Sequence, residues 1–293
     1  MSASQATVLA VDVGGTKIAA GVVDADGRLL RSAVEPTPTG PDPEAIWQAL
    51  TSAVARVEPD GATAVGIGSA GPIAVGGVTV SPLNILGWQE FPLLQRVSDA
   101  YGLPVVIDVD AKALALGEGW KGAGAGVSNF IAMVVSTGVG GGIVVDGRLL
   151  DGAQGNAGHI GHVVVVPGGA VCGCQGRGCL EAEISGTAIG KRIGAPAAQA
   201  SPQEVHRAGQ LLGEGLASVT NLLDLELIAV GGSVALGFGE PFFAACNTAL
   251  HASSRLGFTA RTTVVPVGLG KDGPLIGAGA LAWRMLGEDV GVA

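Results

Sequence analysis

Two histidines and three cysteines lie close together in the middle of the chain. The segment GNAGHIGH (155–162) ends in His159 and His162, and the cysteine-rich segment CGCQGRGC begins ten residues after His162. One imidazole and three thiolates form a common ligand set for a closed, four-coordinate structural zinc site. Inert reduced thiols are the alternative interpretation of this cluster. The predicted zinc ligands are His162, Cys172, Cys174 and Cys179.

Two glycine-rich segments each separate a pair of apolar runs that have the character of strands. They are DVGGTK (12–17) and STGVGGG (136–142). Backbone N–H groups in such turns can point at phosphate oxygens because no Cβ atom intervenes. Asp12 adds a carboxylate that could orient a hydrated magnesium ion, and Lys17 adds a cation. For the first segment alone, a hairpin turn with ordinary surface charges is an equally good interpretation.

Together, the two turns favour a nucleoside triphosphate held between them. A dinucleotide-binding fold of the Rossmann type is excluded, because the second glycine run leads into a strand and not into a helix. A third segment, VGGSV (230–234), ends a strand and could form the floor of a purine pocket. The residues predicted to contact ATP are Asp12, Gly14, Gly15, Thr16, Lys17, Thr137, Gly138, Gly140, Gly141, Gly231 and Gly232.

Asp110 ends the apolar run LPVVIDVD (103–110). In α/β folds the C-terminal ends of strands face the crevice that binds ligands. A carboxylate at this position could accept a proton from a substrate hydroxyl as its oxygen attacks phosphorus. Capping of the following helix is the alternative, and one residue could do both.

Strands alternate with helices in both halves of the chain, which predicts two α/β lobes with a ligand cleft between them. The second half, from about residue 129, repeats the opening order of strand, Thr/Gly turn, strand and Asp-Gly turn, which indicates an internal duplication. Strands are expected at 7–13, 18–24, 28–35, 62–73, 103–110, 129–136, 143–150, 225–233 and 262–268. Helices are expected at 42–57, 111–120, 203–223, 240–254 and from about 274.

Composition excludes several classes of function. The 293 residues carry a net charge of −9 with no basic cluster, which disfavours a nucleic-acid partner. The first residues lack the pattern of a signal peptide, and no run of about 18 apolar residues suggests a membrane span. We therefore expect a cytoplasmic protein.

Taken together, the motifs resemble those of the ROK family of sugar kinases and repressors, within the actin/hexokinase-like superfamily. The matching segments are DVGGTK (12–17), STGVGGG (136–142), GNAGHIGH (155–162), CGCQGRGCLE (172–181), GGSV (231–234) and GPLIGAGALA (273–282). The resemblance implies two actin-like lobes: residues 1–118, joined by the C-terminal helix at about 280–293, and a larger lobe at 119–279 with the zinc loop.

The same resemblance implies roles for single residues. Asp110 would be the catalytic base, with ATP, Mg²⁺ and a structural Zn²⁺ as cofactors. Repressors of this family carry a helix-turn-helix domain before the first phosphate turn, and we expect none here because that turn begins at residue 12. The residues implied to contact the sugar are Gly71, Asn84, Asp110, His159, His162 and Glu181.

Three positions depart from the common pattern of the family. Val109 and Lys112 stand where most members have Asn, and His159 stands where most have Glu. Kinases of N-acetylmannosamine share the GHIGH sequence, so the resemblance implies phosphorylation of the 6-hydroxyl of N-acetylmannosamine. Glucose is the alternative substrate, and a non-catalytic sugar-binding or regulatory protein is the alternative from another class. For His159, a hydrogen bond beside the zinc is the alternative to sugar contact. We also expect a homo-oligomer, either a dimer or a tetramer.

Overall fold

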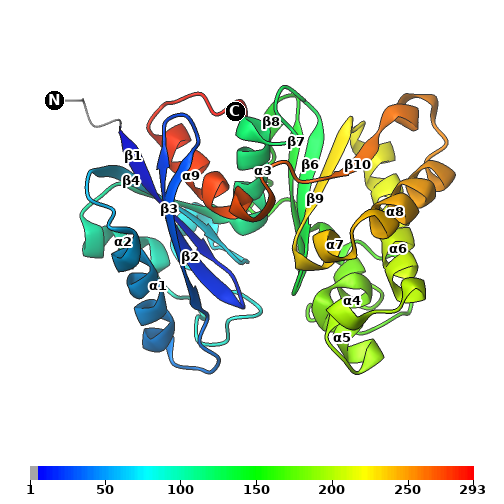
Figure 1. Ribbon diagram of the computed structural model, residues 1–293, viewed down its shortest axis with the longest axis horizontal. Helices are drawn as coiled ribbons and strands as arrows, with labels where there is room; N and C mark the ends of the chain where they lie inside the picture. Colours follow the sequence, from blue (N-terminus) through cyan, green and yellow to red (C-terminus); the bar gives the residue numbers. More distant parts are fainter. Residues whose placement is uncertain (1–5) are drawn as a thin grey trace.

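A computed structural model describes residues 6–293 as two five-stranded mixed sheets that lie side by side (Figure 1). The first sheet has the order β3-β2-β1-β4-β5 and the second β8-β7-β6-β9-β10. The first sheet contains β1 (Thr7–Val13), β2 (Lys17–Asp24), β3 (Leu29–Pro36), β4 (Ala62–Ser69) and β5 (Val105–Val109). The second contains β6 (Phe130–Val135), β7 (Val139–Val145), β8 (Arg148–Leu149), β9 (Leu227–Gly231) and β10 (Thr263–Pro266).

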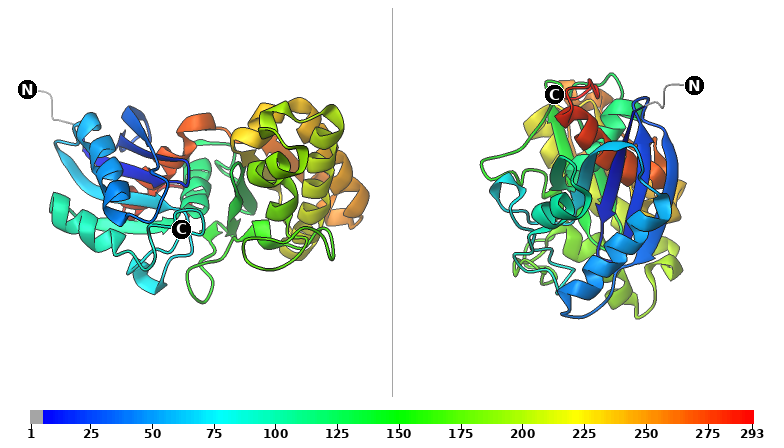
Figure 2. Two further views of the ribbon diagram at one scale, coloured as in Figure 1. Left: turned by 90° about the horizontal axis from the view of Figure 1, so that it is seen from below. Right: turned by 90° about the vertical axis from the view of Figure 1, so that its left-hand side faces the viewer.

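The two sheets have the same connectivity. In each, the first three strands form an antiparallel meander, and the remaining two run parallel to the first strand. Figure 2 shows the two halves from two other directions, with the first half in blue and cyan and the second in green to orange. The expected pair of α/β lobes and the duplication are therefore confirmed in the topology.

Helices cover both sheets. In the first lobe α1 (Pro43–Val57) packs against β2 and β3, and it begins at Asp42, whose carboxylate accepts a hydrogen bond from the Glu44 N–H. In the second lobe α6 (Pro202–Leu223) and α8 (Glu240–Ser253) pack against each other. The other helices are α2 (Leu93–Tyr101), α3 (Asp110–Lys121), α4 (Leu180–Ile184), α5 (Gly186–Ile193), α7 (Ser233–Phe238) and α9 (Gly273–Met285), with short 3₁₀ turns η1 (Val75–Gly77), η2 (Ile160–His162), η3 (Ala197–Gln199), η4 (Gly257–Arg261) and η5 (Gly270–Asp272).

Helices α3 and α9 fill the space between the sheets (Figure 1). The last helix, α9, begins at Gly273 and ends at Met285, and it packs on β1 and β4 of the first sheet. Glycine permits this close approach, because a Cβ atom on Gly66 of β4 would lie 1.8 Å from the carbonyl oxygen of Ala278. Of the described helices, none has the length and apolarity that a bilayer span requires.

The expected turn at 137–142 is too long. Gly140 and Gly141 belong to β7, where they pair with Val134 and Met133 of β6. The glycines serve helix packing, since a Cβ atom on Gly142 would lie 2.6 Å from the Cβ of Ala115 in α3. The strands expected at 62–73 and 103–110 are also too long, because the chain leaves the sheet after residue 69 and enters α3 at residue 110.

Candidate functional site

The two predicted phosphate turns meet. Thr16 in the β1–β2 turn and Thr137 in the β6–β7 turn have their hydroxyl oxygens 3.1 Å apart. Each turn is closed by a backbone hydrogen bond, from the Gly14 N–H to the Lys17 carbonyl and from the Ser136 N–H to the Gly138 carbonyl. The duplicated hairpins therefore point at one another across the interface between the lobes.

Two carboxylates lie beside the first turn. Asp12 is buried near the end of β1, and Asp110 is the first residue of α3 directly after β5, two strands away in the same sheet. Asp110 does not cap its helix: Val109 occupies the cap position, and the Asp110 carboxylate accepts a hydrogen bond from the neighbouring Ala111 N–H. The strand order thus brings together two acids that are far apart in the sequence.

The surroundings of both acids favour their protonated forms. Burial raises the pKa of Asp12 to about 7, the negative charge of Asp110 adds to the rise, and Lys17 opposes it. Burial also raises the pKa of Asp110, whereas the Ala111 N–H and the charge of His159 lower it. A carboxylate whose pKa is raised towards neutrality is a stronger base than an exposed one.

Gly71 and His159 lie beside Asp110. A Cβ atom on Gly71 would be 3.5 Å from Cγ2 of Val109 and 3.8 Å from Nε2 of His159. The His159 Nδ1 atom is 2.9 Å from the Asn156 carbonyl oxygen, which can only accept a hydrogen bond. In the neutral ring Nδ1 therefore carries the proton and Nε2 keeps its lone pair. Toward a ligand on this side, a neutral His159 offers a single lone pair, whereas a carboxylate would offer two acceptor oxygens.

The other residues implied to contact sugar lie at two further places. Asn84 packs over the first turn, where a Cβ atom on Gly15 would be 2.5 Å from its Nδ2. Glu181 accepts a hydrogen bond from the Val139 N–H at 2.9 Å, and its other oxygen is 4.0 Å from the Cys172 thiol. Glu181 therefore links the second turn to the cysteine loop.

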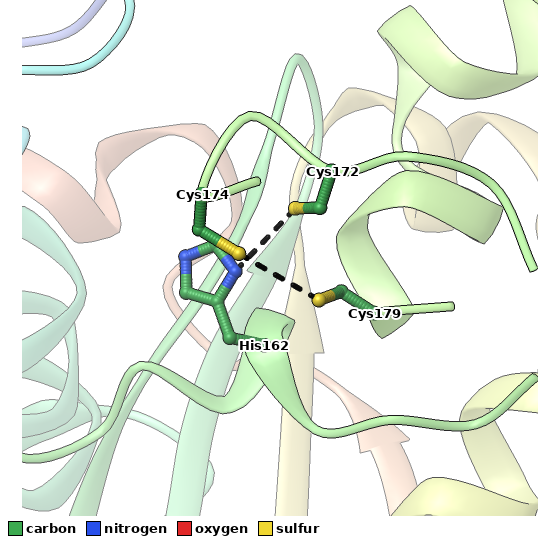
Figure 3. Close-up of side chains that lie close together, drawn as sticks. All are labelled: His162, Cys172, Cys174 and Cys179. Atoms are coloured by element: carbon green, nitrogen blue, oxygen red, sulfur yellow. Dashed lines mark hydrogen bonds between the residues drawn. The ribbon is translucent and has the colours of Figure 1, made fainter. Parts of the chain in front are cut away.

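His162 and the three cysteines form one cluster (Figure 3). The ligand atoms of His162, Cys172, Cys174 and Cys179 all lie within 4.8 Å of one another. His162 Nδ1 is 3.6 Å from the Cys172 sulfur, and the sulfurs of Cys174 and Cys179 are 3.8 Å apart. Tetrahedral zinc with ordinary bond lengths requires about 3.6 Å for an N···S edge and about 3.8 Å for an S···S edge. These two distances match the edges of a zinc site, and the four residues form a group that could hold the metal.

The rings of the two histidines lie near one another, with centroids 6.0 Å apart. His159 faces Gly71 and Asp110, while His162 belongs to the metal cluster. The short turn η2 separates their roles, because Ile160 and Gly161 lie between His159 and His162.

A cavity of about 440 Å³ opens beside the second turn. No charged side chain lines it, and hydroxyl groups alternate with apolar surface, which suits a neutral heterocycle with nearby phosphate or ribose oxygens. Of the segments that line this cavity, the sequence patterns predicted the β6–β7 turn and the GGSV segment. They did not predict α5, η3 and Phe238, because no local motif marks those residues. The lining residues are Ser136, Thr137, Gly186, Thr187, Ala197, Ala198, Ser233, Val234, Gly237 and Phe238.

Four of the glycines predicted to contact ATP have evident structural roles. The Gly141 N–H donates to the Gly158 carbonyl, and Gly140 lies within the β6–β7 ladder. Gly231 ends β9, and Gly232 has a φ of 93°, with room for no side chain because a Cβ atom would lie 2.4 Å from the Val135 carbonyl oxygen. Ser136, Thr137 and Ser233 line the cavity, whereas these four glycines do not.

Comparison with known proteins identifies the family. Residues 8–285 match the model of the ROK family. The chain is 38% identical over 261 residues to an N-acetylmannosamine kinase of Escherichia fergusonii, which covers 83% of this chain and 88% of the relative. The chain therefore belongs to the ROK family, and its curated relatives are sugar kinases.

Solved structures agree with this assignment. A ROK family glucokinase from Streptomyces griseus, in complex with glucose and AMPPNP, has a TM-score of 0.83 and 33% identity, over 95% of this chain and 99% of that one. The ROK hexokinase from Thermus thermophilus has a TM-score of 0.82 and 34% identity, over 97% and 100% of the two chains. The expected actin-like, two-lobed fold is confirmed.

Proposed function

We propose that this ROK family sugar kinase transfers the γ-phosphoryl group of ATP to the 6-hydroxyl of a hexose, with N-acetylmannosamine as the preferred substrate. The observation that carries the proposal is the pair of carboxylates, Asp12 and Asp110, beside the point where Thr16 meets Thr137. This arrangement places a base next to two turns suited to phosphate groups.

Asp110 acts as the general base in this account. Its carboxylate takes the proton from the sugar hydroxyl as the hydroxyl oxygen bonds to the γ-phosphorus, and the bond to the bridging oxygen of ADP breaks. Burial keeps the pKa of Asp110 above its ordinary value, although the Ala111 N–H and the charge of His159 lower it. Asp110 is therefore a stronger base than an exposed aspartate.

Asp12 fits a role in holding a hydrated magnesium ion. The carboxylate is buried beside another acid, with Lys17 as the cation that opposes its raised pKa, so a divalent cation would relieve the repulsion. When bound, Mg²⁺ would neutralise charge on the phosphate oxygens. Thr16 and Lys17 in the first turn and Thr137 and Gly138 in the second would contact those oxygens, and the uncharged cavity would receive the adenine.

The sugar would lie between Gly71, Asp110 and His159. His159 offers a lone pair where a carboxylate stands in most of the family, and Val109 adds apolar surface behind Gly71. A wall with fewer fixed polar contacts tolerates an acetamido group at C2 better than one that fixes each hydroxyl. The curated relatives are named for N-acetylmannosamine, and this supports the same choice.

Glucose is the second candidate substrate. The Streptomyces griseus structure, a glucokinase with glucose bound, is 33% identical to this chain over nearly its whole length. A glucokinase would use the same base and the same two turns. The residues that face C1 and C2 of the sugar would therefore decide between the two substrates.

Zinc would stabilise the substrate side of the site without taking part in phosphoryl transfer. Four protein ligands leave no open coordination position for a reacting water. The metal would instead fix the cysteine loop that delivers Glu181, whose carboxylate holds the Val139 N–H at the second turn.

The position of transfer is a direct test of this function. Purified protein is incubated with ATP, Mg²⁺ and N-acetylmannosamine, and the product is examined by ³¹P and ¹H NMR. Coupling of phosphorus to the C6 protons supports the proposal. Phosphate at C1, or ADP release without a sugar phosphate over a panel of hexoses, contradicts it and favours a non-catalytic sugar-binding protein.

A further inference from the structure

Lys112 is a charged side chain with almost no contact with solvent. It lies on α3 two residues after Asp110, and its side chain is 2% exposed. Its ammonium group is 2.9 Å from the Asp108 carboxylate and 2.7 Å from the Asp151 carboxylate, and it donates to the Gly155 carbonyl at 3.2 Å. Three acceptors match the three N–H donors of an ammonium group, so none is left for a substrate.

These contacts join two distant parts of the chain. Asp108 belongs to β5 of the first sheet, whereas Asp151 and Gly155 lie in the loop that follows β8 of the second sheet. We call residues 151–159 the His159 loop. A buried cation between two carboxylates holds its partners firmly, because loss of the cation would leave the acids facing each other with no compensating charge. Lys112 therefore fastens the start of the His159 loop to β5.

Asn156 fastens the same loop at a second point. Its Nδ2 donates to the Ile73 carbonyl at 3.0 Å, and its Oδ1 accepts from the Ile73 N–H at 3.3 Å. Ile73 follows closely after Gly71, so this paired contact places the loop against the segment that faces His159. A third contact, from the Gly141 N–H to the Gly158 carbonyl, anchors the loop to β7.

The position of the loop decides where His159 points. The Asn156 carbonyl accepts a hydrogen bond from His159 Nδ1. Asn156 therefore binds Ile73 through its side chain and orients the imidazole through its backbone. Displacement of this loop would move Nε2 away from Gly71 and Asp110. A shift of about 1 Å in a substrate-positioning group costs up to about 100-fold in catalytic efficiency.

We propose that Lys112 and Asn156 are positioning residues for sugar binding: they hold the His159 loop against the first lobe, so that the sugar-facing wall is assembled before the sugar arrives. The inference rests on the proposed function, because it takes His159 to face the sugar. It assigns a role to Lys112, which replaces a polar residue common in the family, and it requires no contact between Lys112 and substrate.

The test separates sugar binding from nucleotide binding. Lys112→Met and Asn156→Ala are compared with wild type and with Lys191→Met, which removes an exposed lysine from α5. The KM for N-acetylmannosamine is measured at saturating ATP, the KM for ATP at saturating sugar, and zinc content and Tm for each protein. We expect the sugar KM to rise about 10-fold or more in both loop variants, with the ATP KM within about two-fold and zinc retained. The Lys191→Met control should match wild type.

A second pair of variants guards against misfolding of Lys112→Met. The Asp151 side chain is 65% exposed, so its replacement should not prevent folding. Asp151→Asn keeps an oxygen acceptor for the ammonium group and should keep most of the sugar affinity, whereas Asp151→Ala should raise the sugar KM. If Asp151→Ala has the same sugar KM as wild type, this inference is wrong, whereas the proposed function still stands. The same conclusion follows if folded, zinc-bound Asn156→Ala has the wild-type sugar KM. A wild-type protein that phosphorylates no sugar would overturn the proposed function, and this inference with it.

Discussion

The two lobes share a strand order but not a chemistry. The first hairpin turn carries Asp12 and Lys17, with Asp110 two strands away, and burial raises the pKa of both acids. The second turn carries the hydroxyls of Ser136 and Thr137 and opens onto an uncharged cavity. The same hairpin thus carries charged groups in the first lobe and neutral polar groups in the second. This difference suits a first lobe that carries out the reaction and a second lobe that binds the nucleotide.

Substitution of Asp110 should have the largest effect on the reaction and little effect on nucleotide binding. Asp110→Asn removes the base but keeps its size, so kcat should fall by about 100-fold or more. Nucleotide binding should persist, because the cavity lies beside the second turn. Steady-state kinetics and a nucleotide titration check both parts, and a variant with near wild-type kcat would disprove the assignment.

Removal of the metal should affect the sugar side strongly. Cys174→Ser should lose zinc and raise the sugar KM by about 10- to 100-fold, because the cysteine loop would no longer hold Glu181, which the family resemblance implies as a sugar contact. Metal analysis should give one zinc per wild-type chain, and Cys246→Ala, a buried cysteine outside the cluster, should keep it. Zinc-free protein with normal kinetics would refute a structural role for the metal.

The second lobe can be tested by filling its cavity. Gly237 of α7 lines the cavity, and a Cβ atom there would meet no atom within 4 Å. Gly237→Trp should therefore fold normally and raise the ATP KM about 10-fold, a loss of roughly 1.4 kcal/mol in binding. Gly237→Ala is the matched control, with an ATP KM close to wild type. An unchanged ATP KM in the Trp variant would place the nucleotide elsewhere.

The first lobe should lose stability through its buried acid. The pKa of Asp12 is raised to about 7 in the folded protein against an ordinary value of 3.8. The folded state then binds more protons than the unfolded state between about pH 4 and pH 7, so stability falls as pH rises through this window. With magnesium and ATP absent, Asp12→Asn should raise stability above pH 7 by up to about 4 kcal/mol.

Thermal melts from pH 4 to pH 8 check this prediction. The difference in Tm between Asp12→Asn and wild type should grow with pH, whereas the exposed Asp60→Asn control should follow the wild-type profile. If this difference in Tm shrinks as pH rises, the dependence is opposite to the expected one, and the ionised form of Asp12 is not destabilised by its surroundings.

Local patterns predicted much of this molecule. The helix expected at 42–57, the paired hairpins and the metal cluster depend on residues a few positions apart, and the structure contains all three. Contacts that join distant segments could not be predicted in this way. Lys112 and Asp151 are 39 residues apart, and Asn156 and Ile73 are 83 apart.

Glycines show the same limit. From the sequence, Gly140 and Gly142 read as a phosphate-binding turn, because glycine permits both tight turns and close packing. The structure places them in β7 under α3, with a Cβ atom on Gly140 only 3.3 Å from the Cβ of Ala111. Only the position of a helix that precedes the strand by some twenty residues distinguishes the two roles.

The central claim is that this protein is a hexose kinase in which the residues around His159 favour a 2-acetamido sugar. The most direct test is to measure kcat/KM for N-acetylmannosamine and for glucose on wild type and on His159→Glu. A glutamate would restore the carboxylate common in the family, and we expect the wild type to favour N-acetylmannosamine and His159→Glu to shift the ratio toward glucose by about 10-fold. If wild type strongly prefers glucose and His159→Glu leaves the ratio unchanged, His159 does not face the sugar, and the substrate assignment is wrong.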